Sequence, residues 1–150
     1  MIDIQETDDY QELVSFFIIN GLEFTDEDIP EDGQTPEQIV KQWKAVDTES
    51  GRLVGGCVLA KREGEFICDG IATDPSVRGQ RVGEKLLLIM ENEARSLGAG
   101  SLYLVARAPG FFRKYDFLPV PREAAPEFFE CFTCPQYGVS CHPEVMRHDL

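Results

Sequence analysis

The sequence is poor in basic residues, and its first 40 positions contain no lysine or arginine at all. Fourteen Lys and Arg residues stand against 27 Asp and Glu residues, so the formal net charge is −13. Sequence-independent binding of nucleic acid depends on neutralising phosphates with Lys and Arg. We therefore expect no nucleic-acid partner.

Long hydrophobic runs are absent as well. No stretch approaches the roughly 18 apolar residues that a membrane span requires. The amino terminus, MIDIQE, lacks the basic and apolar segments of a signal peptide. With 43% hydrophobic and 27% charged residues over 150 positions, the composition is that of one globular domain. We expect a single cytoplasmic domain over 1–150 with no membrane partner, in which 121–150 form a cysteine-bearing C-terminal extension.

The basic residues that are present are unevenly placed. Residues 78–114 hold seven basic and three acidic side chains, a local charge of +4 that leaves −17 for the rest of the chain. Such asymmetry can mark an anion site within an acidic protein, and solvated helix faces can carry the same pattern. Both interpretations fit the charges alone.

Hydrophobic periodicity and turn residues predict a mixed α/β arrangement. We expect strands over 2–5, 45–46, 53–59, 66–73, 102–106 and 117–120, and helices over 9–20, 36–44, 82–97 and 109–115. The helix over 82–97 has the clearest pattern, because its apolar positions fall on one face: Val82, Leu86, Met90, Ala94 and Leu97. The order of the elements predicts at least one crossover helix.

The segment over 73–83 joins a strand to this helix and carries two glycines and two arginines. The first amides of a helix have no partner within it, and the helix dipole favours an anion there. Gly79 and Gly83 allow close approach of the backbone, while Arg78 and Arg81 add charge. The pattern predicts a phosphate or pyrophosphate site. A strand-to-helix turn that uses glycine only for its geometry is the alternative.

Two sequence blocks stand out around this segment. The first is DGIATDP at 69–75 followed by VRGQRVGEKLL at 77–87, and the second is GFFRKYDF at 110–117. Together they resemble the GNAT superfamily of acyl-CoA-dependent N-acyltransferases, nearest to its amino-acid N-acetyltransferase branch. The resemblance implies the GNAT fold, an α/β fold with a central, mostly antiparallel sheet, a splayed parallel pair of strands and flanking helices. It also implies acetyl transfer from acetyl-CoA to a primary amine, by direct attack in a ternary complex.

The resemblance further implies where acetyl-CoA binds. Backbone amides from Gly79 to Glu84 would hold the pyrophosphate, and residues 71–73 would pair with the pantetheine arm like an added strand. The family often has Gly where this chain has Arg81, whose amide can still donate. The expected cofactor-binding residues are Ile71, Ala72, Thr73, Arg78, Gly79, Gln80, Arg81, Val82, Gly83, Glu84, Phe111 and Phe112.

Acetyl transfer requires deprotonation of the amine and stabilisation of an oxyanion. The resemblance assigns the oxyanion to a backbone N–H near Ile71 or Ala72. Glu65 and Asp69 are candidates for the general base, because residues four apart on a strand share a face. Solvation of a hairpin end and a strand edge is the alternative role of these two carboxylates, and a bound water can replace either as base.

The departing thiolate can be protonated by a general acid. GNAT enzymes often have Tyr at the position that Phe112 occupies here, and a phenylalanine donates no proton. Tyr115 lies one helical turn further on and is the candidate substitute acid. Alternatively no acid is needed, since a thiol of pKa about 8.5 is a fair leaving group.

The acceptor is less defined. The block over 105–112 resembles the branch that acetylates amino acids, which implies that Arg107 pairs with a substrate carboxylate. The acidic amino-terminal third would instead favour a cationic amine, unless it is simply a solvated surface. We expect a small-molecule amine or amino acid rather than a protein acceptor. The sequence leaves the oligomeric state open, a homodimer included.

Five cysteines complete the candidate residues. Cys57 and Cys68 lie in apolar strand patterns and are expected in the core. Cys131, Cys134 and Cys141 precede His142 and have the composition of a Cys₃His zinc site, with reduced thiols or a disulfide as alternatives. Two other functions therefore stay open, a non-catalytic acyl-CoA-binding or regulatory module, and a zinc or redox sensor.

Overall fold

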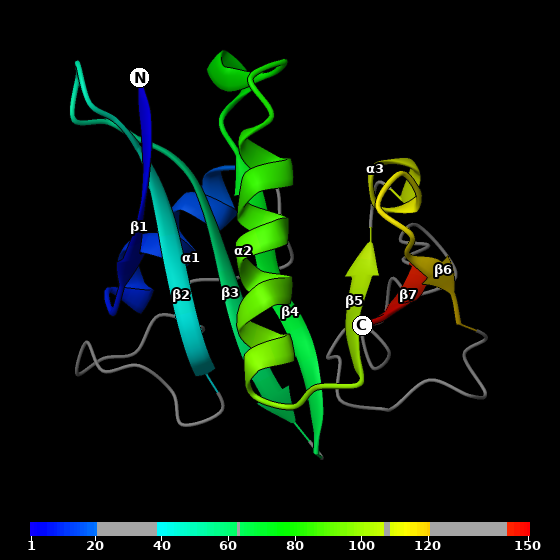
Figure 1. Ribbon diagram of the computed structural model, residues 1–150. Coiled ribbons are helices and arrows are strands. Elements are labelled where there is room, and N and C mark those ends of the chain that lie inside the picture. Colours follow the sequence, from blue (N-terminus) through cyan, green and yellow to red (C-terminus); the bar gives the residue numbers. More distant parts are fainter. Residues whose placement is uncertain (21–38, 63, 107–108, 121–143) are drawn as a thin grey trace.

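One mixed sheet organises the computed structural model, which describes residues 1–20, 39–62, 64–106, 109–120 and 144–150 (Figure 1). Its strand order within these residues is β1-β2-β3-β4-β5-β7-β6. The strands span Ile2–Thr7 (β1), Ile39–Asp47 (β2), Leu53–Arg62 (β3), Glu65–Thr73 (β4), Ser101–Ala106 (β5), Leu118–Pro119 (β6) and Glu144–Asp149 (β7). Neighbouring strands are antiparallel except for the parallel pair β4 and β5. The mixed α/β sheet expected from the sequence is confirmed.

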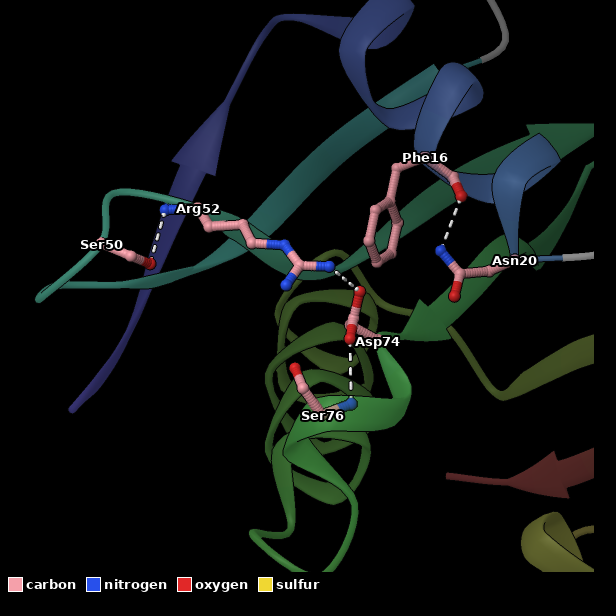
Figure 2. Close-up of polar contacts among 6 residues, drawn as sticks. All are labelled: Phe16, Asn20, Ser50, Arg52, Asp74 and Ser76. Atoms are coloured by element: carbon pink, nitrogen blue, oxygen red, sulfur yellow. Dashed lines mark hydrogen bonds and ion pairs between the residues drawn. The ribbon is translucent and has the colours of Figure 1, made fainter.

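Helices cover both faces of this sheet. Among the described residues they are α1 (Tyr10–Ile19), α2 (Val82–Ser96) and the short α3 (Pro109–Arg113), and a 3-10 turn spans Pro75–Val77. Asp9 begins α1 by accepting a hydrogen bond from the Glu12 amide at 3.1 Å. At the other end, the Asn20 side chain donates to the Phe16 carbonyl at 2.9 Å (Figure 2). At each end of α1, a side chain thus forms a hydrogen bond with a backbone group of the helix.

The apolar face of α2 builds the larger part of the core. Four of its five predicted members are buried, with exposures of 2% or less, namely Val82, Leu86, Met90 and Ala94. They pack with residues of the sheet such as Trp43, Cys57 and Cys68. The fifth, Leu97, lies just past the helix end and is 48% exposed, so its predicted place on the buried face is wrong.

Helix α1 approaches the opposite face of the sheet very closely. A Cβ atom added at Gly56 would lie 2.5 Å from Cδ2 of Leu13, and one added at Gly70 would lie 2.7 Å from Cε2 of Phe17. Leu13 and Phe17 are completely buried. Glycine at both positions therefore allows this close packing, since an added Cβ would displace a fully buried side chain of α1.

The parallel pair β4 and β5 is joined over only two positions. Phe66 lies opposite Leu102 and Ile67 opposite Tyr103, and beyond this point the two strands diverge (Figure 1). A register shift in the β3–β4 ladder makes Asp69 an extra residue of β4, because Cys68 faces Leu59 while Gly70 faces Val58. Such a bulge bends the strand that carries it. The splay and the bulge thus occur within a few residues of each other.

The bulge also changes which side chains of β4 face each helix. Before it, Phe66 and Cys68 pack in the cluster that contains α2. After it, Gly70 lies under Phe17 of α1, whereas Ile71 packs on the α2 side. The simple alternation of a strand is therefore interrupted at Asp69.

Two sequence predictions of secondary structure fail. The helix expected over 36–44 is wrong from residue 39 onward, where the chain is strand β2. This strand pairs with β1 and β3 on its two edges, and such pairing overrides local helix propensity. The sequence also gave no indication of β7, which lies between β5 and β6 and buries Val145 and Met146.

Within the described residues, no helix is long and apolar enough to cross a membrane.

Candidate active site

A cavity of about 390 Å³ lies where the end of β4, the start of α2 and the helix α3 meet. Ligand-binding cavities in proteins commonly have this size. Its lining comes from three segments of the chain, namely Ile71, Ala72 and Thr73; Val77, Arg78, Gly79, Arg81, Val82, Gly83 and Glu84; and Phe111, Phe112 and Tyr115.

The cavity gathers most of the residues that sequence reasoning had singled out. Eleven of the twelve expected cofactor-binding residues line it, together with Tyr115, the candidate acid. Gln80 is exposed and is not among the lining residues. Val77 lines the cavity but was not predicted, although its apolar side chain between two polar positions was a usable signal.

Asp74 fixes the loop that leads from β4 into this cavity. Its carboxylate accepts a hydrogen bond from the Ser76 amide at 2.9 Å. It also forms an ion pair with Nη2 of Arg52 at 2.8 Å (Figure 2). The hydrogen bonds from Ser76, with a smaller contribution from Arg52, lower the pKa of Asp74 below its ordinary value. The loop is thus attached to the β2–β3 turn through a carboxylate that is ionised at neutral pH.

Two residues of the loop have left-handed backbone conformations. Gly79 has a φ of +83°, and Arg81, which directly precedes α2, has a φ of +60°. Arg81 makes no side-chain hydrogen bond to the first turn of the helix. The first hydrogen bond to its carbonyl comes from the Lys85 amide at 3.1 Å. The amides of the first turn and the positive end of the helix dipole therefore point toward the cavity side of the loop.

Gly83 allows the first turn of α2 to lie against α3. A Cβ atom at Gly83 would stand 3.2 Å from Cζ of Phe111. The Phe111 ring contacts that of Phe112 at 5.1 Å between centroids and that of Tyr115 at 5.2 Å. The three rings form an apolar wall opposite the charged loop, and Phe112 is the most buried of them at 8% exposure.

The two candidate bases lie on β4 outside the cavity lining. Glu65 begins the strand, and Asp69 is the bulged residue near the splay, with its Oδ2 atom buried. The bulge interrupts the alternation on which their predicted common face was based. Glu65 instead lies close enough to Arg147 of β7 to interact with its charge.

The described cysteines are core residues, as the sequence predicted. Cys57 and Cys68 are free, buried thiols, and burial raises the pKa of both. Among the described positions, no group of three or more His, Cys, Asp or Glu side chains is placed to hold a metal ion. Arg107, Cys131, Cys134, Cys141 and His142 lie outside the described residues.

Comparison with known proteins places this arrangement among acetyltransferases. Residues 41–119 match the family model of the acetyltransferase (GNAT) domain. No curated protein matches the sequence significantly.

Solved structures with the same fold are distant in sequence. An acetyltransferase of the GNAT family from Staphylococcus aureus is 18% identical, with a TM-score of 0.76 and coverage of 100% of this chain and 99% of that chain. An N-acetylglutamate synthase from Neisseria gonorrhoeae, complexed with coenzyme A and N-acetyl-glutamate, is 16% identical, with a TM-score of 0.73. The match covers 100% of this chain and 35% of the synthase chain. The ribosomal-protein-S18-alanine N-acetyltransferase from Escherichia coli is 15% identical, with a TM-score of 0.70. The match covers 99% of this chain and 94% of that chain. At these identities the likeness shows the fold alone.

Proposed function

Because the chain belongs to the GNAT family of acetyltransferases, it is an acyltransferase, and we propose that it transfers the acetyl group of acetyl-CoA to the primary amine of a small molecule. The observation that carries this proposal is the cavity at the open end of the β4–β5 splay, with the amino terminus of α2 on one side and three aromatic rings on the other. An amino acid is one candidate acceptor.

The charged side of the cavity suits the pyrophosphate of acetyl-CoA. The amides of the first turn of α2 have no partner within the helix, and Arg78 and Arg81 add positive charge beside them. A Cβ at Gly83 would come into close contact with Phe111, so this position favours a residue without a side chain. These features fit a phosphate group approaching the backbone directly.

The splay suits the pantetheine arm. Beyond Ile67, the edge of β4 that faces β5 has no pairing with that strand. Residues 71–73 line the cavity on this edge. An extended pantetheine chain can therefore hydrogen-bond to β4 in the way that an added strand would, which leads its thioester toward the bulge at Asp69.

The reaction is then a direct acyl transfer. The amine nitrogen attacks the thioester carbonyl carbon, a new C–N bond forms, and the C–S bond breaks. The amine loses one proton to a base, and the CoA thiolate gains one. A backbone N–H near Ile71 or Ala72 would stabilise the oxyanion, and Glu65 or Asp69, directly or through water, would take the proton. Cys57 and Cys68 are unsuited to carry an acyl group, because their raised pKa values keep the thiols protonated.

The cavity is tested by filling it at Gly83. Gly83→Leu should weaken acetyl-CoA binding about fivefold or more, because fitting the side chain against Phe111 costs about 1–3 kcal/mol. Gly100→Leu is the matched control, since Gly100 is exposed and a Cβ there meets no atom within 4 Å. Calorimetry measures the binding, and free CoA release against a panel of amines and amino acids measures the activity. Equal affinities in the two variants would contradict the assigned cavity.

Tyr115 is the proposed proton donor to the leaving thiolate. Its ring lines the cavity and contacts Phe111, while Phe112, at the family's usual tyrosine position, has no hydroxyl. Tyr115→Phe should lower kcat by about 10²-fold, the low end of general-acid effects. Acetyl-CoA affinity should be unchanged, because the ring remains. A normal rate in this variant would show that the thiolate leaves without Tyr115.

The presence of Phe112 also favours a second candidate function, a module that binds acyl-CoA without catalysis. Such a module would bind acetyl-CoA with the same dependence on Gly83 and would release no CoA with any amine of the panel. The activity screen therefore separates the two functions in one measurement.

A further inference from the structure

The guanidinium of Arg147 lies near the splay and takes no part in the acyl transfer proposed above. Arg147 of β7 lies directly opposite Tyr103 of β5, and Tyr103 in turn lies opposite Ile67 of β4. Ile67 is the last residue of β4 that pairs with β5 before the strands diverge. Arg147 is therefore level with the base of the splay.

The side chain of Arg147 lies on the face of the sheet opposite α2. Leu102 and Leu104 of β5 and Met146 of β7 all pack in the cluster that contains α2. Alternation along each strand then places Tyr103 and Arg147 on the other face. Glu65 shares this face, because its neighbour Phe66 packs on the α2 side. The face opposite α2 thus carries both Arg147 and the candidate base Glu65 at the base of the splay.

Arg147 is held in a defined position there. The guanidinium lies over the Tyr103 ring, with its carbon 6.0 Å from the ring centroid, and Nε pairs with Oδ1 of Asp149 at 3.1 Å. A hydrogen bond with Tyr103 is the main cause of a raised pKa for Arg147, and the charges of Asp149 and Glu65 contribute. Tyr103 is itself buried at 9% exposure, which gives the cation a fixed support.

The same guanidinium remains accessible. Its side chain is 44% exposed, and the Asp149 carboxylate that it contacts is 75% exposed. An exposed ion pair of this kind contributes little to stability. A carboxylate of a bound molecule can therefore replace Asp149 on Arg147 without a large loss of folding free energy, and the planar guanidinium suits a carboxylate in bidentate geometry.

From this placement we infer that Arg147, supported by Tyr103, binds the carboxylate of the acceptor and so selects amines that carry a carboxylate, such as amino acids. The inference rests on the proposed function and names the acceptor class for the same site. An acceptor bound in this way lies across the base of the splay on the face that α2 leaves free. Its amine is directed toward β4, where Glu65 and Asp69 are located and where the thioester would end.

The test compares matched acceptors on matched variants. Each amino acid is paired with the amine that lacks only its carboxylate, and both are assayed by free CoA release. Arg147→Gln should raise the KM of the amino acid tenfold or more and leave the KM of the simple amine unchanged. Arg147→Lys should restore part of the amino-acid affinity, because it keeps the charge and loses the bidentate geometry. Acetyl-CoA affinity should be unaffected in both variants.

Arg95→Gln serves as the control for loss of a half-exposed arginine. Arg95 is 45% exposed, close to the value for Arg147, and lies on α2 at the opposite face. It should change neither KM. Equal KM changes for both acceptors in Arg147→Gln, or a selective loss of amino-acid affinity in Arg107→Ala with none in Arg147→Gln, would overturn the inference.

A binding measurement separates this inference from the proposed function. Calorimetric titration of the same amino acid into the CoA-loaded protein requires no turnover. If no acceptor releases CoA, the proposed function fails. Amino-acid binding that is lost in Arg147→Gln would still support the carboxylate site, and binding that is equal in wild type and Arg147→Gln, or absent from the wild type, would contradict it.

Discussion

Arg81 combines two properties at the entrance to α2. Its φ of +60° lies in the left-handed region, which costs a residue with a Cβ roughly 1–2 kcal/mol. Its side chain is 80% exposed and interacts only weakly with Glu84, at 4.0 Å. The backbone strain of Arg81 is therefore not offset by a strong contact of its side chain within the protein. Binding of an anionic ligand by the guanidinium would explain why arginine, rather than glycine, occupies this position.

Arg81→Gly separates the two properties. We expect the free energy of unfolding to rise by up to about 1 kcal/mol, because Gly adopts the left-handed conformation without strain and loses part of this gain to unfolded-chain entropy. Acetyl-CoA affinity should fall several-fold, with a weaker dependence on salt. Urea unfolding and calorimetry at two salt concentrations measure the two effects.

Arg78→Gly is the control for this comparison. Arg78 has a φ of −59°, so glycine relieves no strain there and should not stabilise the protein. Stabilisation of both variants would show that the left-handed backbone of Arg81 is not strained. Unchanged CoA affinity in Arg81→Gly would limit its role at the site to the backbone amide.

At the scale of elements, a largely buried polar contact connects α2 to β7. Oε1 of Glu91 lies 2.9 Å from Nδ1 of His148, and the Glu91 side chain is only 3% exposed. The His148 ring contacts Phe117, which contacts Phe112 of the cavity wall. Through these contacts the helix that begins at the cavity and the strand that carries Arg147 are held in one arrangement.

Removing one partner of this pair should be costly. His148→Leu removes the partner at 2.9 Å from the buried Glu91 side chain, leaving Arg95 at 4.0 Å, and should lower the free energy of unfolding by about 1–3 kcal/mol. The double variant Glu91→Leu, His148→Leu should recover much of this loss, because an apolar pair leaves no buried polar group without a partner. Thermal and urea unfolding of Glu91→Leu, His148→Leu and the double variant form the cycle that measures the coupling. Strictly additive losses would contradict a direct interaction.

At the scale of the whole molecule, the charge distribution follows the architecture. The basic segment over 78–114 contains part of the cavity loop, α2 and α3, and two of its arginines, Arg78 and Arg81, line the cavity of the proposed cofactor site. The acidic remainder contributes the ion pair beside the cavity loop, in which Asp74 lies 2.8 Å from Arg52. An anionic cofactor is thus attracted locally by a protein that is strongly negative overall.

Much of this protein was determined by local sequence. The amphipathic period of α2 and the glycines and arginines of the loop depend on neighbours within a few residues, so an anion site there could be predicted from local pattern, and the resemblance to the GNAT superfamily supplied the other residues of the cavity lining. Side-chain spacing along a helix and the unpaired amides of its first turn are local properties, so neighbouring residues are enough to indicate them.

Other features were decided only by tertiary structure. Residues 39–47 are a strand because β1 and β3 pair with both edges, and the bulge at Asp69 interrupts the alternation on which the common face of Glu65 and Asp69 was predicted. Arg147 comes from β7, a strand with no strong pattern of its own, and reaches the base of the splay because β7 inserts between β5 and β6. Pairing partners and register depend on residues far apart in the chain, and local propensity contains no information about them.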